Sequence, residues 1–274
     1  ATMTDRDGPA GHGQGAPRTA LITGASAGLG AEFARQLAAA GHDLVLTARR
    51  ADRLQALAAE LSERGAAVTV LPADLSEPGA PAALEAALAE RGIAIDVLIN
   101  NAGAAGPDLL EDRDWDVHER YLRLMTISMA ELCHRFVPPM RAAGWGRVLN
   151  VASVAGRIAR PAGGHYGPAK AWVIALSEEL NLTLRADGVH VTALCPGFTH
   201  TEFHEAGGLS EMKAGTPSWL WYDAEIVVRE GLQALERNQA VVLSGRLYRW
   251  IDPFLQSVWT RGLIQHSGVA PRRK

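Results

Sequence analysis

The chain has 274 residues, of which 47% are hydrophobic, and a formal net charge of −3. This length and apolar content suffice to bury a full core as one α/β domain. The weakly acidic balance and the absence of a basic stripe argue against a nucleic-acid partner. No stretch reaches the ~18 uninterrupted apolar residues of a membrane span.

The cysteines and the amino-terminal residues bear on compartment and domain organisation. Cys133 and Cys195 fit neither a metal spacing nor a disulfide framework, so we expect buried free thiols in a reducing cytoplasm, and no metal site. Residues 1–18 are rich in glycine and proline and lack the apolar core of a signal peptide. We expect a flexible tail over 1–18 and a single domain over 19–274.

The first predicted strand, residues 20–22, leads into a glycine-rich turn and then into a segment with helical spacing. A strand, a glycine-rich turn and a helix together offer backbone N–H groups to a pyrophosphate. A loop that merely turns is the simpler alternative. Because the flanking strand and helix both fit, we predict a dinucleotide site here, formed by Gly24, Ser26, Gly28, Leu29 and Gly30.

The second predicted strand, residues 43–48, ends at two arginines. A NAD-preferring site carries an acidic side chain there, which accepts hydrogen bonds from the adenosine ribose. Arg49 and Arg50 would instead bind a 2′-phosphate through charge-assisted hydrogen bonds, and Ser26 could add a hydroxyl. A solvated helix start is the alternative. The sequence favours NADP(H) over NAD(H).

Helices and strands then alternate without a break in composition. We predict strands over 67–71, 95–99, 147–152 and 189–194, and helices over 54–64, 81–91 and 166–185. A long helix over 112–136 is expected to be closed by Pro138 and Pro139. This alternation implies a parallel sheet covered on both faces.

Two loops at strand ends are candidates for cofactor contacts. Asp74 and Leu75 follow the third strand, where a carboxylate beside the adenine and a plain surface turn both remain open. The fourth strand ends in amides and small residues that suit a chain end packed against the sheet and the cofactor: Asn100, Asn101, Ala102 and Gly103.

Three residues indicate acid–base chemistry. Tyr166 and Lys170 lie four apart on one predicted helix and share a face, while Ser153 follows a strand end, where α/β sheets place ligands. A nearby ammonium lowers the pKa of a tyrosine, so Tyr166 could pass a proton to a carbonyl oxygen that Ser153 holds. Each residue alone is compatible with ordinary packing. Together with the glycine turn they predict a catalytic triad.

These motifs resemble the short-chain dehydrogenase/reductase family over about residues 18–245. The resemblance implies a Rossmann sheet of about seven parallel strands in three α/β/α layers, and hydride transfer between NAD(P)(H) and a small-molecule alcohol/carbonyl pair. It also implies a homodimer or homotetramer, and a Lys170 that binds the nicotinamide ribose. The resemblance and the strand-end positions give the remaining cofactor contacts: Asn101, Ala102, Gly103, Tyr166, Pro196, Gly197, Thr199 and Thr201.

Two positions depart from the family pattern. Many members carry an asparagine in the long helix, where it holds a water in a proton relay from the lysine, and Met125 falls at that position. Methionine forms no useful hydrogen bond, so either the backbone or Thr126 holds the water, or proton delivery is impaired. Ala169 replaces a common serine. A cofactor-binding module with little turnover and a cofactor-retaining epimerase therefore remain alternatives.

The segment over about 198–223 falls where the family has its variable substrate loop, and it is apolar. It is either a lid over a hydrophobic carbonyl substrate or a core or subunit contact. His165 is a further pocket candidate, although we expect it to face solvent. The predicted substrate contacts are Ser153, Val154, Tyr166, Phe198 and Phe203.

The extension over about 246–274 carries an aromatic stripe with helical spacing. Asp252 and Pro253 are expected to interrupt it, as the N-cap and first residue of a short final helix. Packing on the domain or at a subunit interface is the main interpretation. A lid over the pocket is less favoured, and so is peripheral contact with an anionic membrane.

Overall fold

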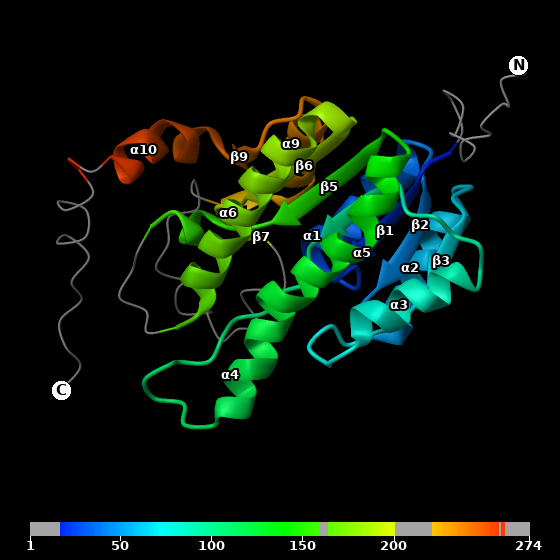
Figure 1. The fold of residues 1–274 in the computed structure, drawn as a ribbon, viewed down its shortest axis with the longest axis horizontal. Coiled ribbons are helices and arrows are strands. Elements are labelled where there is room, and N and C mark those ends of the chain that lie inside the picture. The colour runs from blue at the N-terminus through cyan, green and yellow to red at the C-terminus, as the bar shows by residue number, and fades with distance from the viewer. Residues whose placement is uncertain (1–16, 159–163, 201–220, 258, 261–274) are drawn as a thin grey trace, which may run out of the picture.

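The computed structural model of the protein describes residues 17–158, 164–200, 221–257 and 259–260. Its centre is a seven-stranded sheet in the order β3-β2-β1-β4-β5-β6-β9, in which each neighbouring pair is parallel. This confirms the predicted doubly wound fold with about seven parallel strands (Figure 1). The strands are β1 (Thr19–Thr23), β2 (Asp43–Thr47), β3 (Val68–Val70), β4 (Val97–Asn100), β5 (Gly146–Val151), β6 (Val189–Cys195) and β9 (Val241–Leu243).

Helices cover both faces of the sheet, because successive side chains of a strand point to opposite faces. In β1, Ile22 packs into one apolar cluster with Phe33 of the first helix, whereas the neighbouring Leu21 packs into the other with Phe136. One face carries α1 (Gly28–Ala39), α2 (Ala51–Ser62) and α9 (Ala224–Glu236). The other carries α3 (Ala80–Ala89), α5 (Ser128–Ala142) and α6 (Tyr166–Leu184).

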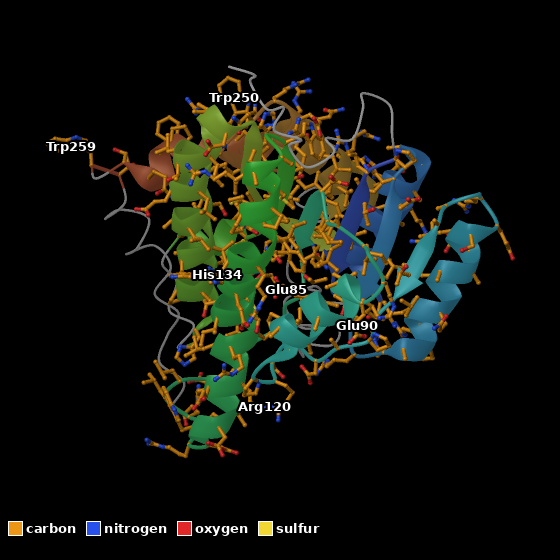
Figure 2. All side chains as sticks on the ribbon, turned by 45° about the vertical axis from the view of Figure 1, so that its right-hand side comes forward. Glu85, Glu90, Arg120, His134, Trp250 and Trp259 are labelled. Atoms are coloured by element: carbon orange, nitrogen blue, oxygen red, sulfur yellow. The ribbon has the colours of Figure 1, made fainter. Side chains whose placement is uncertain are left out.

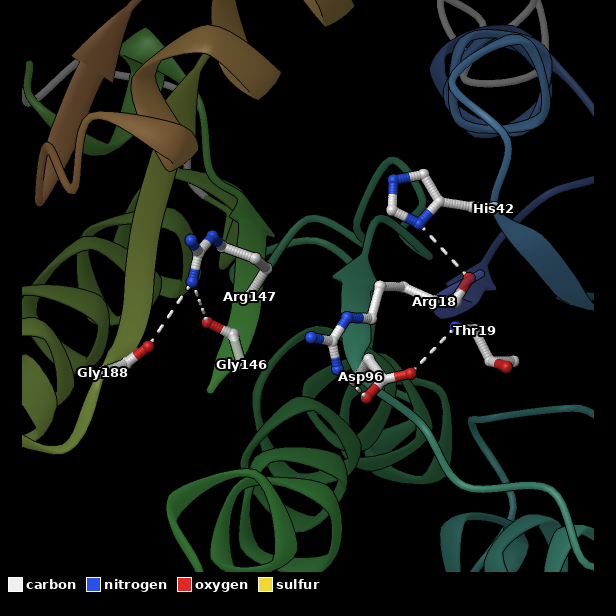
Figure 3. Close-up of polar contacts among 7 residues, drawn as sticks. All are labelled: Arg18, Thr19, His42, Asp96, Gly146, Arg147 and Gly188. Carbon is white, nitrogen blue, oxygen red and sulfur yellow. Dashed lines mark hydrogen bonds and ion pairs between the residues drawn. The ribbon is translucent and has the colours of Figure 1, made fainter. Parts of the chain in front are cut away.

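Polar side chains link neighbouring strands at the amino ends of the sheet (Figure 3). Asp96 accepts hydrogen bonds from the Thr19 backbone N–H at 3.0 Å and from Arg18 Nη1 at 3.4 Å. The guanidinium carbons of Arg18 and Arg147 lie 4.3 and 4.4 Å from the ring centre of Trp145, within range of a cation–π contact. These contacts tie the amino ends of the strands together, whereas the loops at the carboxyl ends line a cleft.

A long helical segment is present, but its expected bounds of 112–136 are wrong, and a π-helical turn interrupts its regular α-helical hydrogen bonding. The segment consists of α4 (Trp115–Leu122), a π-helical turn (Arg123–Ile127) and α5, and it begins where Asp114 Oδ1 accepts from the Asp116 backbone N–H. Pro138 and Pro139 lie inside α5 and do not close it. Each proline removes one intrahelical N–H donor, but the buried side chains of Val137 and Met140 hold this last turn against the sheet.

Two further expectations meet different outcomes. Cys133 and Cys195 are buried free thiols, as predicted, and burial raises the pKa of each to about 12. The flexible tail expected over 1–18 is wrong at its end, because Arg18 pairs with Asp96 and its carbonyl accepts from the Asp43 backbone N–H. Residues 1–16, the loop positions Thr201 and Phe203, and residues 261–274 lie outside the described residues. No helix in the described ranges is long and apolar enough to cross a membrane.

Candidate active site

A cleft of ≈ 1250 Å³ opens at the carboxyl ends of the central strands. The structure brings nearly all of the predicted site residues to this one cavity. Gly30 is not among its lining residues, because it packs against the Gly24 carbonyl oxygen. The lining includes the predicted residues Gly24, Ser26, Gly28, Leu29, Arg49, Arg50, Asp74, Leu75, Asn101, Ala102, Gly103, Ser153, Val154, Tyr166, Lys170, Pro196, Gly197, Phe198 and Thr199.

The glycine turn is pressed against the end of β4, and two of its positions have no room for a side chain. A Cβ at Gly24 would lie 2.9 Å from the Ala102 Cα, and a Cβ at Gly30 would lie 2.2 Å from the Gly24 carbonyl oxygen. Thr23 Oγ1 accepts from the backbone N–H groups of Asn101 and Ala102, both at 2.9 Å. The turn and the Asn101 segment are therefore one rigid unit, whose bare backbone lines the cleft.

Basic and acidic side chains meet at the β2 end of the cleft. Arg50 donates from Nε and Nη2 to Ser26 Oγ, at 3.3 and 3.1 Å, which directs its guanidinium over the glycine turn. Asp74 accepts from the Ser76 hydroxyl at 2.6 Å and from its backbone N–H at 2.9 Å. Burial opposes ionisation of Asp74, but the Ser76 hydrogen bonds and the charges of Arg49 and Arg120 outweigh it, so the pKa of Asp74 lies below its ordinary value.

Ser153 and Lys170 are held in place by the end of β5. Ser153 begins a 3₁₀ turn (Val154–Gly156), and its Oγ accepts from the Ala155 backbone N–H at 3.1 Å. Lys170 Nζ donates to the Val151 carbonyl oxygen at 2.7 Å and lies 5.8 Å from the ring centre of Tyr166. Burial lowers the pKa of Lys170 to about 8. An amine that is protonated at neutral pH and loses its proton near pH 8 thus stands close to the phenol.

Met125 occupies the π-helical turn and is 1% exposed. It is close to the lysine, since a Cβ at Gly103 would lie 3.4 Å from Met125 Sδ and 3.8 Å from Lys170 Nζ. Thr126 Oγ1 donates to the Leu122 carbonyl oxygen at 2.7 Å, so its proton is already used within its own helix. The turn therefore presents a thioether, and no side-chain amide, to the region around Gly103 and Lys170.

The expectation that His165 faces solvent is wrong. His165 is half-buried, with Nε2 3.1 Å from Nδ1 of the buried His118, whose own Nε2 is 3.1 Å from the Asp112 carbonyl oxygen. Because a carbonyl only accepts, His118 carries its proton on Nε2, and His165 Nε2 donates to His118 Nδ1. This pair joins α4 to the start of α6. The sequence reasoning missed His118 and Tyr121, although their spacing with Met125 predicts a shared helix face.

The predicted interruption at Asp252 and Pro253 is also wrong, because α10 (Arg246–Gln256) runs through both. Asp252 is not an N-cap but the ion-pair partner of Arg157. Gln256 Nε2 donates to the Arg157 carbonyl oxygen at 2.7 Å and lines the cleft, a contact that the sequence reasoning missed. Trp250, at 77% exposed, and Trp259, at 88%, lie on the outer surface (Figure 2).

Comparison with known proteins gives a consistent result. The chain matches the short chain dehydrogenase family model over residues 18–210. It is 34% identical over 197 residues to a D-beta-hydroxybutyrate dehydrogenase of Rhizobium meliloti (strain 1021), which covers 69% of this chain and 74% of the relative.

Two solved structures extend the similarity to the fold. A short-chain dehydrogenase from Sphingobium yanoikuyae in complex with NADPH is 35% identical and superposes with a TM-score of 0.76. The match covers 94% of this chain and 98% of that one. A bulky-bulky ketone specific alcohol dehydrogenase from Comamonas testosteroni is 29% identical, with a TM-score of 0.74 and coverage of 94% and 96%.

Proposed function

This chain belongs to the short-chain dehydrogenase family and is an NAD(P)-dependent oxidoreductase of alcohol and carbonyl groups, and we propose that it prefers NADP(H) and acts on an apolar ketone or aldehyde, or on the corresponding secondary alcohol. The observation that carries the proposal is the convergence of Ser153, Tyr166 and Lys170 in one cleft with the glycine turn.

The residues of the cleft fit a dinucleotide. Because Gly24 and Gly30 leave no room for side chains between the turn and the Asn101 segment, the turn packs closely and offers bare backbone N–H groups to a pyrophosphate. Arg49 and Arg50 would hold the 2′-phosphate, with Arg50 already oriented by Ser26. The NADPH in the Sphingobium yanoikuyae structure supports the same preference. When bound, NADPH supplies the hydride for the carbonyl carbon.

The protein's own residues handle the proton. We assign to Tyr166 the donation of its phenolic proton to the carbonyl oxygen, and its recovery in the reverse direction. Ser153 Oγ accepts a backbone hydrogen bond, which leaves its own proton available for the same substrate oxygen. The Lys170 ammonium stabilises the Tyr166 phenolate that remains.

The substrate end of the cleft is mostly apolar, which favours a hydrophobic carbonyl compound. Its described wall carries few charges, and Arg157 there is already paired with Asp252. The bulky ketone named for the Comamonas testosteroni enzyme points the same way. The apolar lining consists of Ala104, Ala105, Pro107, Leu109, Leu110, Val154, Ile158 and Phe198.

A panel of carbonyl compounds, from small and polar to bulky and apolar, tests this function through nicotinamide absorbance with NADPH and NADH in parallel. We expect NADPH-dependent turnover that favours apolar ketones and disappears in Tyr166→Phe. Binding of NADPH without turnover of any compound would favour a cofactor-binding module. Conversion of a chiral alcohol without net change in cofactor would favour an epimerase.

We also propose a homodimer or homotetramer, on the ground of family membership. Light scattering of the purified protein tests this, and a monomer at micromolar concentration would contradict it.

A further inference from the structure

Tyr121 brings a second phenol to the catalytic end of the cleft. It lies in α4 one turn before Met125, and these two residues form a buried cluster with Ala169. Tyr166 packs against that cluster. The apolar patch beneath the catalytic tyrosine therefore contains one polar group, the Tyr121 hydroxyl.

That hydroxyl is buried without a hydrogen-bond partner among the described residues. Tyr121 is 6% exposed, and its ring is confined on one side, because a Cβ at Gly106 would lie 2.8 Å from Tyr121 Cζ. An unsatisfied buried hydroxyl is destabilising, and a phenylalanine of the same shape would avoid that cost. A buried hydroxyl without a partner calls for an explanation, and a hydrogen bond that forms during the reaction provides one.

Of the groups around Tyr121, Tyr166 is the one that gains negative charge in the proposed reaction. The titratable side chains near it in the described structure are Tyr166, which packs against its cluster, His165, whose ring centre lies at 6.3 Å, and His118, three residues earlier on the same helix face. No ring nitrogen of His165 lies within hydrogen-bond distance of the Tyr121 hydroxyl, and Nε2 of His165 is engaged with His118. Burial and the nearby charge of ionised Tyr166 raise the pKa of Tyr121, so Tyr121 stays protonated and able to donate when Tyr166 ionises.

We propose that Tyr121 is a positioning residue whose hydroxyl donates a hydrogen bond toward the Tyr166 oxygen and stabilises its phenolate. This inference rests on the proposed function. During carbonyl reduction the proton of Tyr166 moves to the substrate oxygen, and Tyr121 keeps its own proton. The Tyr121 hydroxyl thereby supplies a hydrogen-bond donor one helical turn from Met125, whose side chain has none.

Tyr121→Phe tests the inference because it removes only the hydroxyl. Tyrosinate absorbance of the cofactor-free protein, corrected with Tyr166→Phe, reports the ionisation of Tyr166 without turnover. We expect that ionisation to move about one pH unit higher in Tyr121→Phe, and alcohol oxidation at neutral pH to slow about tenfold in kcat with KM unchanged. The unfolding midpoint should stay or rise, since an unpaired buried hydroxyl is removed.

Two further variants sharpen the test. Tyr222→Phe, which removes a phenol that packs on Tyr248 elsewhere in the fold, should leave the Tyr166 titration unchanged. Tyr121→Phe with Met125→Asn should recover part of the lost rate, because an amide returns to the same helix face.

The outcomes separate this inference from the proposed function. A Tyr166 titration and a pH–rate profile that coincide in Tyr121→Phe and wild type would overturn the role of Tyr121. A lower rate accompanied by a lower unfolding midpoint would also overturn it, as a structural effect. Full turnover in Tyr166→Phe would instead overturn the proposed function itself.

Discussion

Arg157 and Asp252 form a two-pronged ion pair, with Nε–Oδ1 at 2.5 Å and Nη2–Oδ2 at 2.7 Å, between the segment after Ser153 and helix α10. Their side chains are 18% and 13% exposed. The hydrogen bonds from Arg157 to Asp252 raise the pKa of the guanidinium, against the opposing effect of burial. This pair, with the Gln256 contact, holds α10 as a wall of the cleft.

Removing one partner of this pair should loosen that wall. We expect Asp252→Asn to lower the free energy of unfolding by about 2 kcal/mol, because a partly buried guanidinium loses its counter-charge. KM for an apolar ketone should rise while NADPH binding is kept. Glu225→Gln serves as the control, because Glu225 pairs with Arg229 at 70% and 50% exposure, and should change stability little. Denaturant unfolding measures both variants, and equal losses would contradict the clamp.

The pKa of Lys170 predicts a pH limb for carbonyl reduction. Lys170 is charged below about 8 and loses its proton above it, so its support of the Tyr166 phenolate is present at neutral pH and is lost as pH rises through about 8. The rate of NADPH-dependent reduction, measured from pH 6 to pH 10, should fall across that window. Lys170→Met should be slower by about a hundredfold or more at neutral pH, and lack this limb. An unchanged limb in Lys170→Met would assign the limb to another group.

Cofactor preference should reside in the arginines after β2. Arg50→Ala removes a guanidinium oriented by Ser26, and we expect KM for NADPH to rise about tenfold or more while KM for NADH changes little. Arg53→Ala, in α2 outside the lining of the cleft, is the matched control for the loss of one positive charge. Steady-state kinetics with both cofactors checks this. A parallel rise for NADH would show that Arg50 does not read the 2′-phosphate.

Much of the fold and cleft was predictable because the signals are local. The strand, turn and helix around Gly24 follow one another directly, and Tyr166 and Lys170 share a face through helical spacing alone. Parallel strands bring their carboxyl ends to one edge, so Ser153 and Asn101 reach the same cavity as the glycine turn.

The errors at proline also have a physical cause. Pro138, Pro139 and Pro253 each remove one backbone donor, but all three lie close to the carboxyl end of a helix. Packing of Met140 and the charge of Arg157 on Asp252 offset that loss. Neither contact can be inferred from the sequence next to the prolines.

The contacts that could not be predicted from the sequence join residues far apart in the chain. His118 and His165 lie 47 positions apart, and Arg157 and Asp252 lie 95 apart. No local pattern pairs such residues. The π-helical turn that places Met125 beside Lys170 has no sequence signal of its own, since its residues also suit an α-helix.

Transfer of deuterium from NADPH that carries deuterium at both positions of the nicotinamide C4 tests the central claim most directly. With an apolar ketone, the alcohol formed by wild-type protein should carry one deuterium on its carbinol carbon by mass spectrometry, and Tyr166→Phe should form almost none. Unlabelled alcohol, or equal labelled product from Tyr166→Phe, would contradict the assignment of hydride transfer to this cleft with Tyr166 as its proton donor.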